Sequence, residues 1–285
     1  MADVVEGTLY VVATPIGNLE DLSPRAARLL GEVALVAAED TRHTAGLLRH
    51  LGLSRLMLSL HEHNEAERVD QLDARLMAGE DIALVSDAGT PLISDPGFVL
   101  VRELRRRGRR IAPVPGPCAL VAALSAAGLP TDRFLFSGFL PAKSSARRQR
   151  LSELAERQET LVFYESPHRI RATLDDLGST LAERRVVLAR ELTKRFETFL
   201  DGTPAQLIER LSEDPDQARG EFVVMVAGGE KQEDAEQAQL SADTLLRALL
   251  AEGVGVKQTA SVAAKILGGA RKQWYQQAQA LKDED

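Results

Sequence analysis

The stretch Leu84-Val85-Ser86-Asp87-Ala88-Gly89-Thr90-Pro91-Leu92-Ile93-Ser94-Asp95-Pro96-Gly97 decides the fold, because a buried strand ends in it and a helix follows it. The apolar run 81–85 predicts the strand, and the apolar spacing over 98–104 predicts the helix. A plain connection between two such elements takes about two to six residues. This one spends about ten residues on groups that fix backbone angles or present oxygens, among them two glycines, two prolines and two Ser-Asp pairs. We therefore expect a ligand loop at the carboxyl end of a strand, where open α/β sheets bind ligands.

The second half of this loop also has a simpler interpretation. Ser94 or Asp95 would cap the following helix, and Pro96 would occupy its first position. Capping leaves residues 86–91 unexplained, so the ligand loop remains our prediction.

Strands and helices alternate on both sides of this loop. We predict strands over 8–13, 33–38, 81–86 and 110–114, with helices over 24–31, 41–51, 64–78 and 98–107. Such alternation is typical of an α/β layer with a mostly parallel sheet. The run Pro115-Gly116-Pro117 can continue neither element, so we place a domain boundary there and expect a first domain over 1–115.

The rest of the chain predicts a second α/β domain over 116–228. Its expected strands at 185–190 and 197–200 follow each other closely, which favours antiparallel pairing in a mixed sheet. The polar segment 229–240 is interpreted as a linker. Residues 241–285 predict three helices with short glycine turns, either a helix-turn-helix-like module or a packing and dimerisation element.

The composition is that of a globular protein with a real core. Of the 285 residues, 44% are hydrophobic and 27% charged. Acids near the amino terminus argue against a signal peptide, and no apolar run reaches about 18 residues, so we expect a cytoplasmic protein without a membrane segment. The lone Cys118 is interpreted as a small core residue, and no Cys/His cluster predicts a metal site.

Charge is unevenly distributed along the chain. The net charge is −7, yet residues 101–200 hold 19 basic and 11 acidic side chains, against 16 basic and 31 acidic in the remainder. The basic run 102–110 is explained by the solvated side of a helix. The segment 141–150 has little apolar content and is interpreted as an exposed RNA-binding loop, carrying Lys143, Arg147, Arg148 and Arg150.

A second elaborate loop, residues 13–24, follows the first predicted strand. It contains neither a Gly-x-Gly-x-x-Gly fingerprint nor a Walker lysine, which leaves a phosphate-cradling nucleotide site unsupported. Two such loops at strand ends are expected to converge on one small molecule.

Five sequence blocks then identify a family. They are Thr14-Pro15-Ile16-Gly17-Asn18-Leu19-Glu20-Asp21, Ala38-Glu39-Asp40-Thr41-Arg42, Val85 through Gly97, Pro113-Val114-Pro115-Gly116-Pro117, and Phe163-Tyr164-Glu165-Ser166-Pro167-His168-Arg169. In this order, over roughly residues 7–228, they resemble the small-subunit ribosomal RNA methyltransferase I family of the tetrapyrrole-methylase class. The resemblance implies two α/β domains with a cleft between them, and a homodimer. It also implies S-adenosylmethionine-dependent methylation of a cytidine ribose 2′-hydroxyl in the decoding region of small-subunit ribosomal RNA, either free or in the 30S subunit.

The resemblance also implies a set of cofactor-binding residues. These are Pro15, Ser86, Asp87, Ala88, Gly89, Thr90, Ser94, Pro115 and Gly116. Small residues suit the task, because they let backbone amides and carbonyls approach the cofactor closely. On this interpretation Asp87 positions the cofactor and Asp95 caps the helix.

The proton acceptor for the ribose hydroxyl stays open among several groups. Lys194 lies between Arg190 and Arg195, whose charges would lower its pKa, and His168 has an ordinary pKa near neutrality. Glu165 belongs to the same block as His168. Further candidates are Glu39, Asp40, Arg42 and Glu191.

Two other functions remain as alternatives. A tetrapyrrole-precursor C-methyltransferase would use the same fold, but it gives no reason for the basic segment or the helical tail. A cofactor-sensing RNA-binding protein would bind without catalysis. We favour the RNA methyltransferase.

Overall fold

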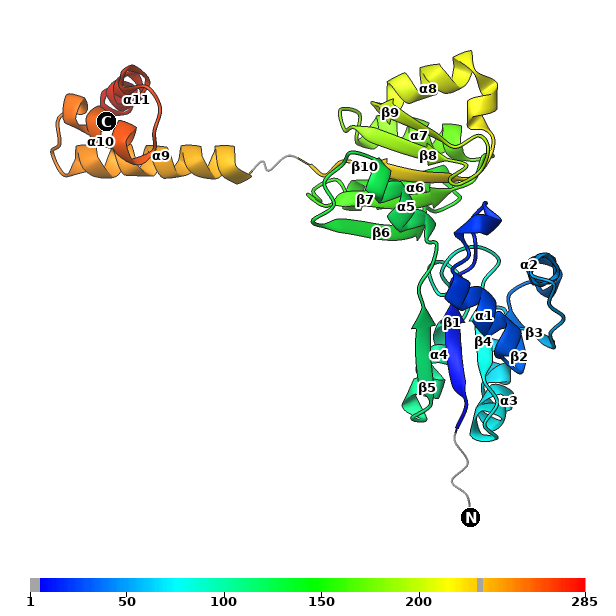
Figure 1. Cartoon of the computed structure of the whole chain (residues 1–285). Coiled ribbons are helices and arrows are strands. Elements are labelled where there is room, and N and C mark those ends of the chain that lie inside the picture. The colour runs from blue at the N-terminus through cyan, green and yellow to red at the C-terminus, as the bar shows by residue number, and fades with distance from the viewer. Residues whose placement is uncertain (1–5, 230–232, 285) are drawn as a thin grey trace. The chain divides into compact units, whose positions relative to one another are not determined.

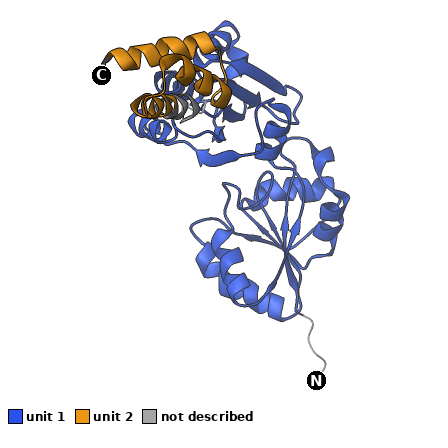
Figure 2. Ribbon diagram, turned by 90° about the vertical axis from the view of Figure 1, so that its left-hand side faces the viewer, with its two compact units in different colours: residues 1–229 blue, residues 230–285 orange. Residues whose placement is uncertain are grey.

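The computed structural model describes residues 6–229 and 233–284 (Figure 1). The chain divides into two compact units, residues 1–229 and 230–285 (Figure 2). Among the described residues, every helix is too short or too polar to cross a lipid bilayer.

The first sheet is entirely parallel, as the alternation of elements predicts. Its strands are β1 (Thr8–Val12), β2 (Leu35–Ala38), β3 (Met57–Ser59), β4 (Ile82–Val85) and β5 (Arg110–Val114), in the order β3-β2-β4-β1-β5. The short edge strand β3 was not predicted. The helices are α1 (Pro24–Glu32), α2 (Thr41–His50), α3 (Glu65–Met77) and α4 (Phe98–Arg106), and the 3-10 turn η1 spans Leu19–Asp21.

Helices cover both faces of this sheet, which is why its central strands are continuous apolar runs. Successive side chains of a strand point to opposite faces. Leu35 and Ala37 accordingly belong to a core with the apolar sides of α3 and α4, whereas Val36 and Ala38 belong to another with α1 and α2. A strand buried on both faces has no room for polar residues until it ends, so the polar loop residues gather at the carboxyl edge.

The second sheet is mixed. It consists of β6 (Phe134–Phe139), β7 (Thr160–Glu165), β8 (Val186–Arg190), β9 (Thr198–Gly202) and β10 (Phe222–Val226), in the order β6-β7-β10-β8-β9. Only β6 and β7 run parallel, and the predicted antiparallel pairing of β8 with β9 is confirmed. The helices are α5 (Ala119–Ala126), α6 (Ser144–Glu153), α7 (Ile170–Thr180) and α8 (Pro204–Glu213), and η2 spans Pro215–Ala218. The predicted boundary at 115/116 lies between β5 and α5.

The two faces of this sheet are covered differently. Helices α6, α7 and α8 pack on one face, while α5 covers the other together with Ile16 of the first loop. A residue that follows β1 of the first sheet thus contributes its side chain to the core of the second sheet.

The second unit consists of α9 (Glu233–Ala251), α10 (Val256–Ile266) and α11 (Arg271–Glu284). A small core of Leu246, Ala263, Ala278 and Leu281 joins these helices. The linker predicted over 229–240 needs correction, because α9 begins at Glu233 rather than near Ser241. Glu, Gln and Ala dominate 233–239 and are good helix formers, and polarity alone does not separate a linker from a solvated helix. Residues 230–232 lie outside the described residues.

Candidate functional site

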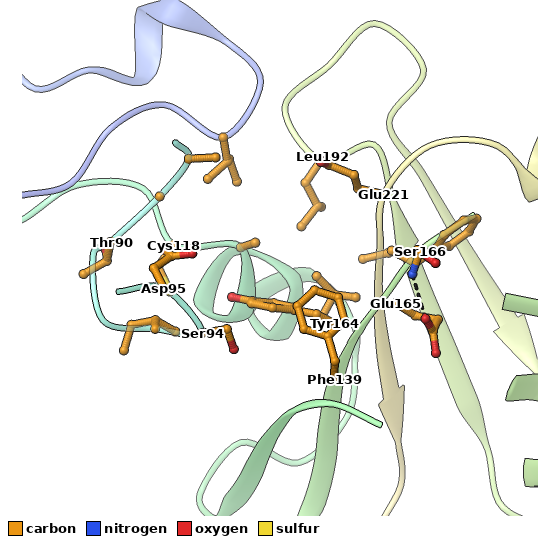
Figure 3. A pocket seen from close by; sticks show the side chains of 18 of the residues that line it. Thr90, Ser94, Asp95, Cys118, Phe139, Tyr164, Glu165, Ser166, Leu192 and Glu221 are labelled. Carbon is orange, nitrogen blue, oxygen red and sulfur yellow. Dashed lines mark hydrogen bonds between the residues drawn. The ribbon is translucent and has the colours of Figure 1, made fainter. Parts of the chain in front are cut away.

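A cavity of about 380 Å³ lies in the first unit, with walls from both of its sheets (Figure 3). The loop after β4 forms one wall, and the ends of β6, β7 and β10 form the opposite one. Its lining includes Ile16, Ala88, Gly89, Thr90, Ser94, Asp95, Cys118, Phe139, Tyr164, Glu165, Ser166, Leu192 and Glu221. This size and mixture of apolar walls with a few polar groups are those of a small-molecule site.

Backbone hydrogen bonds fix the loop after β4 against the first loop. The amide of Thr14 donates to the carbonyl of Gly89 at 2.9 Å, and the amide of Gly89 donates back at 3.0 Å. Gly89 has φ of 81°, and a Cβ atom there would lie 3.3 Å from Ile16. Leu92 and Ser94 also adopt positive φ, at 74° and 68°. Such conformations cost about 1–3 kcal/mol each and concentrate at functional sites, which supports the interpretation of this segment as a ligand loop.

The predicted cofactor-binding residues fall into three groups. Four of them line the cavity, namely Ala88, Gly89, Thr90 and Ser94. Three others, Pro15, Ser86 and Asp87, line a second cavity. Pro115 and Gly116 line neither.

Close packing explains Gly116 without a ligand. A Cβ atom at Gly116 would lie 3.0 Å from that of Ala13, so this glycine lets the chain pass beside the end of β1. Gly17 has a similar function, since its Cβ would meet the side chain of Lys194 at 2.5 Å.

The second cavity has about 390 Å³ and lies at the carboxyl edge of the parallel sheet. Its walls come from the first loop, the first turns of α2 and the end of β4. Its lining is Thr14, Pro15, Leu19, Arg42, His43, Thr44, Gly46, Leu47, Ser86 and Asp87.

Asp95 lines the first cavity and does not cap α4, which corrects the sequence interpretation. The N-cap is Gly97, it has no side-chain cap, and Pro96 lies outside the helix. Burial is the main cause that raises the pKa of the Asp95 carboxyl to about 6. The negative charges of Glu39 and Asp87 act in the same direction, and a hydrogen bond with Ser86 opposes them. A carboxyl of this kind can accept a proton near neutral pH.

Lys194 does not match the predicted base. Its Nζ donates to Oε1 of Glu191 and to Oε2 of Glu221, both at 2.9 Å. Partial burial would lower the pKa of Lys194, but its hydrogen bonds and the charges of Glu191 and Glu221 outweigh burial and raise it. Lys194 therefore stays charged at neutral pH. The prediction considered only the arginines adjacent in sequence, and the two carboxylates lie beside Lys194 only in the folded chain.

The other two predicted catalytic residues have different surroundings. Glu165 lines the cavity but is buried, and its carboxylate accepts from the Ser166 amide at 2.8 Å and the Thr173 hydroxyl at 2.7 Å. These bonds suit a group that holds the start of the next segment in place. His168 is exposed, and it is absent from the cavity lining. Of the remaining candidates, Glu39 has a pKa raised by burial and by Asp87.

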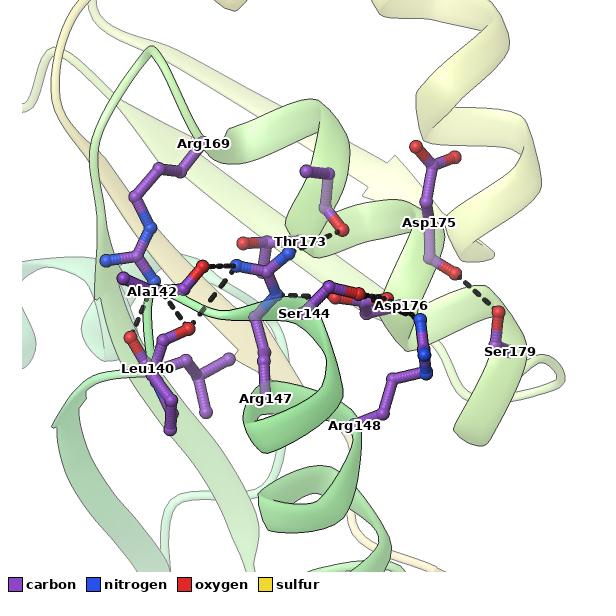
Figure 4. A network of polar contacts seen from close by, with 12 residues as sticks. Leu140, Ala142, Ser144, Arg147, Arg148, Arg169, Thr173, Asp175, Asp176 and Ser179 are labelled. Carbon is purple, nitrogen blue, oxygen red and sulfur yellow. Dashed lines mark hydrogen bonds and ion pairs between the residues drawn. The ribbon is translucent and has the colours of Figure 1, made fainter.

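The basic segment near α6 is not the exposed loop that the sequence suggested. Arg147 is only 2% exposed, and its Nε donates to the Asp176 carboxylate at 2.7 Å (Figure 4). Arg148 reaches the same carboxylate at 3.1 Å. Because Ser144–Glu153 forms a helix packed on α7, the face carrying Arg147 turns inward. Lys143 and Arg148 remain exposed, and Arg150 is half-buried beside Glu153.

Sequence reasoning missed the aromatic wall of the cavity. The hydroxyl of Tyr164 accepts from the Leu120 amide at 3.2 Å, and burial raises its pKa. Phe139 packs edge-on against Tyr164, with ring centroids 5.8 Å apart. Tyr164 belongs to a quoted signature block and could have been found there. Phe139 could not, because nothing in its neighbourhood distinguishes it from a core residue. Among the described residues, no three His, Cys, Asp or Glu side chains gather as metal ligands would.

Two family models match this chain. The model of the tetrapyrrole (corrin/porphyrin) methylases matches residues 8–208, and the RsmI C-terminal HTH domain matches residues 234–282. The first covers the whole first sheet and every strand of the second sheet except β10, and the second covers most of the helical unit.

Curated relatives are similar over nearly their whole length. The ribosomal RNA small subunit methyltransferase I of Pseudomonas aeruginosa is 55% identical over 95% of this chain and 96% of the relative. The ribosomal RNA small subunit methyltransferase I of Xylella fastidiosa is 53% identical over 94% of this chain and 98% of the relative. A solved uroporphyrin-III C-methyltransferase of Thermus thermophilus, in complex with S-adenosylhomocysteine, is 20% identical, covers 78% of this chain and 97% of its own, and has a TM-score of 0.51. This last likeness shows the fold.

Proposed function

Since this chain belongs to the ribosomal RNA small subunit methyltransferase I family, we propose that it methylates a cytidine ribose 2′-hydroxyl in small-subunit ribosomal RNA, with S-adenosylmethionine as donor. The observation that carries the proposal is the cavity between the ligand loop and the second sheet. The likeness of this chain to ribosomal RNA methyltransferases, which extends through the helical unit, supports RNA as the substrate. The likeness to tetrapyrrole methyltransferases is at the level of the fold, so the C-methyltransferase is the weaker candidate.

The first cavity fits S-adenosylmethionine. Its volume of about 380 Å³ is in the range of small-molecule sites, and Gly89 lines it at a position where a Cβ atom would lie only 3.3 Å from Ile16. We assign Ala88, Gly89, Thr90 and Ser94 to the cofactor, with Ile16 and Leu192 as apolar walls. The bound cofactor supplies a methyl group that is already activated on a sulfonium. Much of the rate can then come from holding the ribose oxygen in line with it.

We assign proton removal to Asp95. It lines the same cavity, and its pKa of about 6 leaves it ionised at neutral pH while keeping it more basic than an ordinary aspartate. Glu165 is a positioning residue, because its two bonds hold the segment after β7. Lys194 and His168 are not retained.

RNA binding is supported by charge. From Gly253 to Lys282 the chain has no acidic residue but five basic ones, all exposed: Lys257, Lys265, Arg271, Lys272 and Lys282. Exposed cations along a segment without acidic residues attract phosphates without reading sequence. In the first unit we assign the exposed Lys143 and Arg148 to RNA binding. We remove Arg147 from the predicted RNA-binding residues because it is buried.

We also propose a homodimer in the cytoplasm. The exposed apolar side chains of Val121 and Phe196, 59% and 62% accessible, are candidates for a subunit contact. The cytoplasm follows from the proposed ribosomal substrate. Light scattering after gel filtration measures the subunit number directly.

The test of function is incubation with methyl-labelled S-adenosylmethionine and small subunits from a strain that lacks the methylation. Label recovered on a cytidine 2′-oxygen supports the proposal. Label on a tetrapyrrole precursor offered in parallel supports the C-methyltransferase, and cofactor binding without label in either supports a non-catalytic sensor.

A further inference from the structure

The second cavity remains without a function after the first is assigned to the cofactor. We propose that it receives the base of the target nucleotide of the RNA, turned out of its stack, while the attached ribose reaches the cofactor cavity, and that Asp87 recognises the amino group of cytosine. This inference rests on the proposed function and names the subsite for its substrate.

The two cavities are neighbours, because adjacent residues of the same two loops line one cavity or the other. Thr14 and Gly89 join the first loop to the loop after β4 through a pair of backbone hydrogen bonds. Along the first loop, Pro15 lines the second cavity while the next residue, Ile16, lines the first. Along the other loop, Asp87 lines the second and Ala88 the first. The base of a nucleotide held in the second cavity would therefore lie beside the loops that line the cofactor cavity, and the proposal requires its ribose 2′-oxygen to extend past them to the methyl group and Asp95.

Asp87 has a carboxylate oxygen to offer. Its Oδ1 accepts from the backbone amide of Asp40 at 3.0 Å, which fixes the side chain at the cavity wall. Its other oxygen has no hydrogen bond among the residues that the structure describes. The exocyclic amine of cytosine is a donor that a carboxylate accepts well, whereas uracil presents a carbonyl oxygen at the same position. Asp87 would therefore accept cytidine and repel uridine.

The rest of the cavity suits a nucleotide. The apolar side chains of Leu19 and Leu47 offer a surface for the flat base. Arg42 is at the rim with its side chain 90% exposed, paired with Asp40 at 2.7 Å. An exposed pair of this kind holds weakly, so Arg42 can turn to an RNA phosphate. His43 lines the same cavity and is exposed as well.

The main test uses Asp87→Asn, which keeps the size of the side chain and an oxygen for the Asp40 amide. Two properties are measured: the affinity for S-adenosylmethionine by calorimetry, and methylation of reconstituted small subunits that carry cytidine or uridine at the target position. We expect unchanged cofactor affinity, a loss of about 10- to 100-fold in kcat/KM on cytidine, and loss of the preference for cytidine over uridine. Asp132→Asn, an exposed aspartate of the second half, is the matched control.

Arg42→Gln provides a second variant, at a side chain that is 90% exposed. It should raise KM for the RNA, leave kcat unchanged and weaken the salt dependence of RNA binding. A parallel loss of cofactor affinity in Asp87→Asn would overturn the inference, because the second cavity would then belong to the cofactor. An unchanged cytidine preference would overturn the reading of the base by Asp87. Inactivity of the wild-type protein on both RNAs would instead overturn the proposed function, and this inference with it.

Discussion

Asp95→Asn should make the protein more stable and less active at the same time. The folded protein raises the pKa of Asp95 from 3.8 to about 6, chiefly because burial disfavours the charged carboxylate. A group whose pKa is raised on folding stabilises the fold below its unfolded pKa and loses that contribution as pH rises through the folded pKa. Above pH 6 the folded protein must therefore hold a carboxylate in an unfavourable place.

The magnitude follows from the two pKa values. Their difference corresponds to about 3 kcal/mol at full strength, since each pKa unit is about 1.4 kcal/mol. Asp95 is only partly buried, so screening by water reduces this to about 1–2 kcal/mol. Asparagine has nearly the same shape and no charge. The variant should gain that amount at pH 8, and the gain should shrink through pH 6 and largely disappear by pH 4.

Urea unfolding of the wild type and the variant at pH 8, 6 and 4 measures this difference, with Asp132→Asn as the exposed control. Activity should change in the opposite direction, because a general base contributes about 10²- to 10⁴-fold. We expect kcat to fall at least about 100-fold and the inflection near pH 6 in the wild-type pH profile to vanish. A variant that is less stable at pH 8, or that keeps the inflection, would refute the reasoning about this carboxyl.

Three further perturbations test other parts of the molecule. Gly89→Val should abolish S-adenosylmethionine binding in calorimetry while circular dichroism stays unchanged, because φ of 81° is unfavourable for a β-branched residue; retained affinity would remove this loop from the cofactor site. Arg147→Ala should destabilise the protein by about 3–5 kcal/mol in urea unfolding, since it leaves Asp176 buried with weaker partners; a change below about 1 kcal/mol would contradict the buried pair. The double variant Lys257→Glu with Lys272→Glu should weaken RNA binding several-fold at low salt and leave cofactor affinity unchanged; equal loss of both would indicate a structural role for the helical unit.

The sequence alone determined the elements, the fold and the position of the ligand loop. Apolar runs such as Ile82–Val85 reveal buried parallel strands, because a strand covered on both faces excludes polar side chains along its length. The turn residues from Ser86 to Gly97 identify the loop, since their backbone preferences are local. The short β3 escaped this reasoning because three half-buried residues at a sheet edge leave too weak a pattern.

Only the tertiary structure decided what individual polar residues do. Arg147 can be buried because the carboxylate of Asp176, 29 residues away, forms an ion pair with it. Lys194 keeps its proton because the carboxylate of Glu221 lies beside it. The ligand loop itself divides between two cavities, because Asp87 lines one and Ala88 lines the other. The charge state and exposure of a side chain depend on groups distant in the chain, and no local pattern records them. The sequence therefore located the site, and the packing of distant segments assigned its residues.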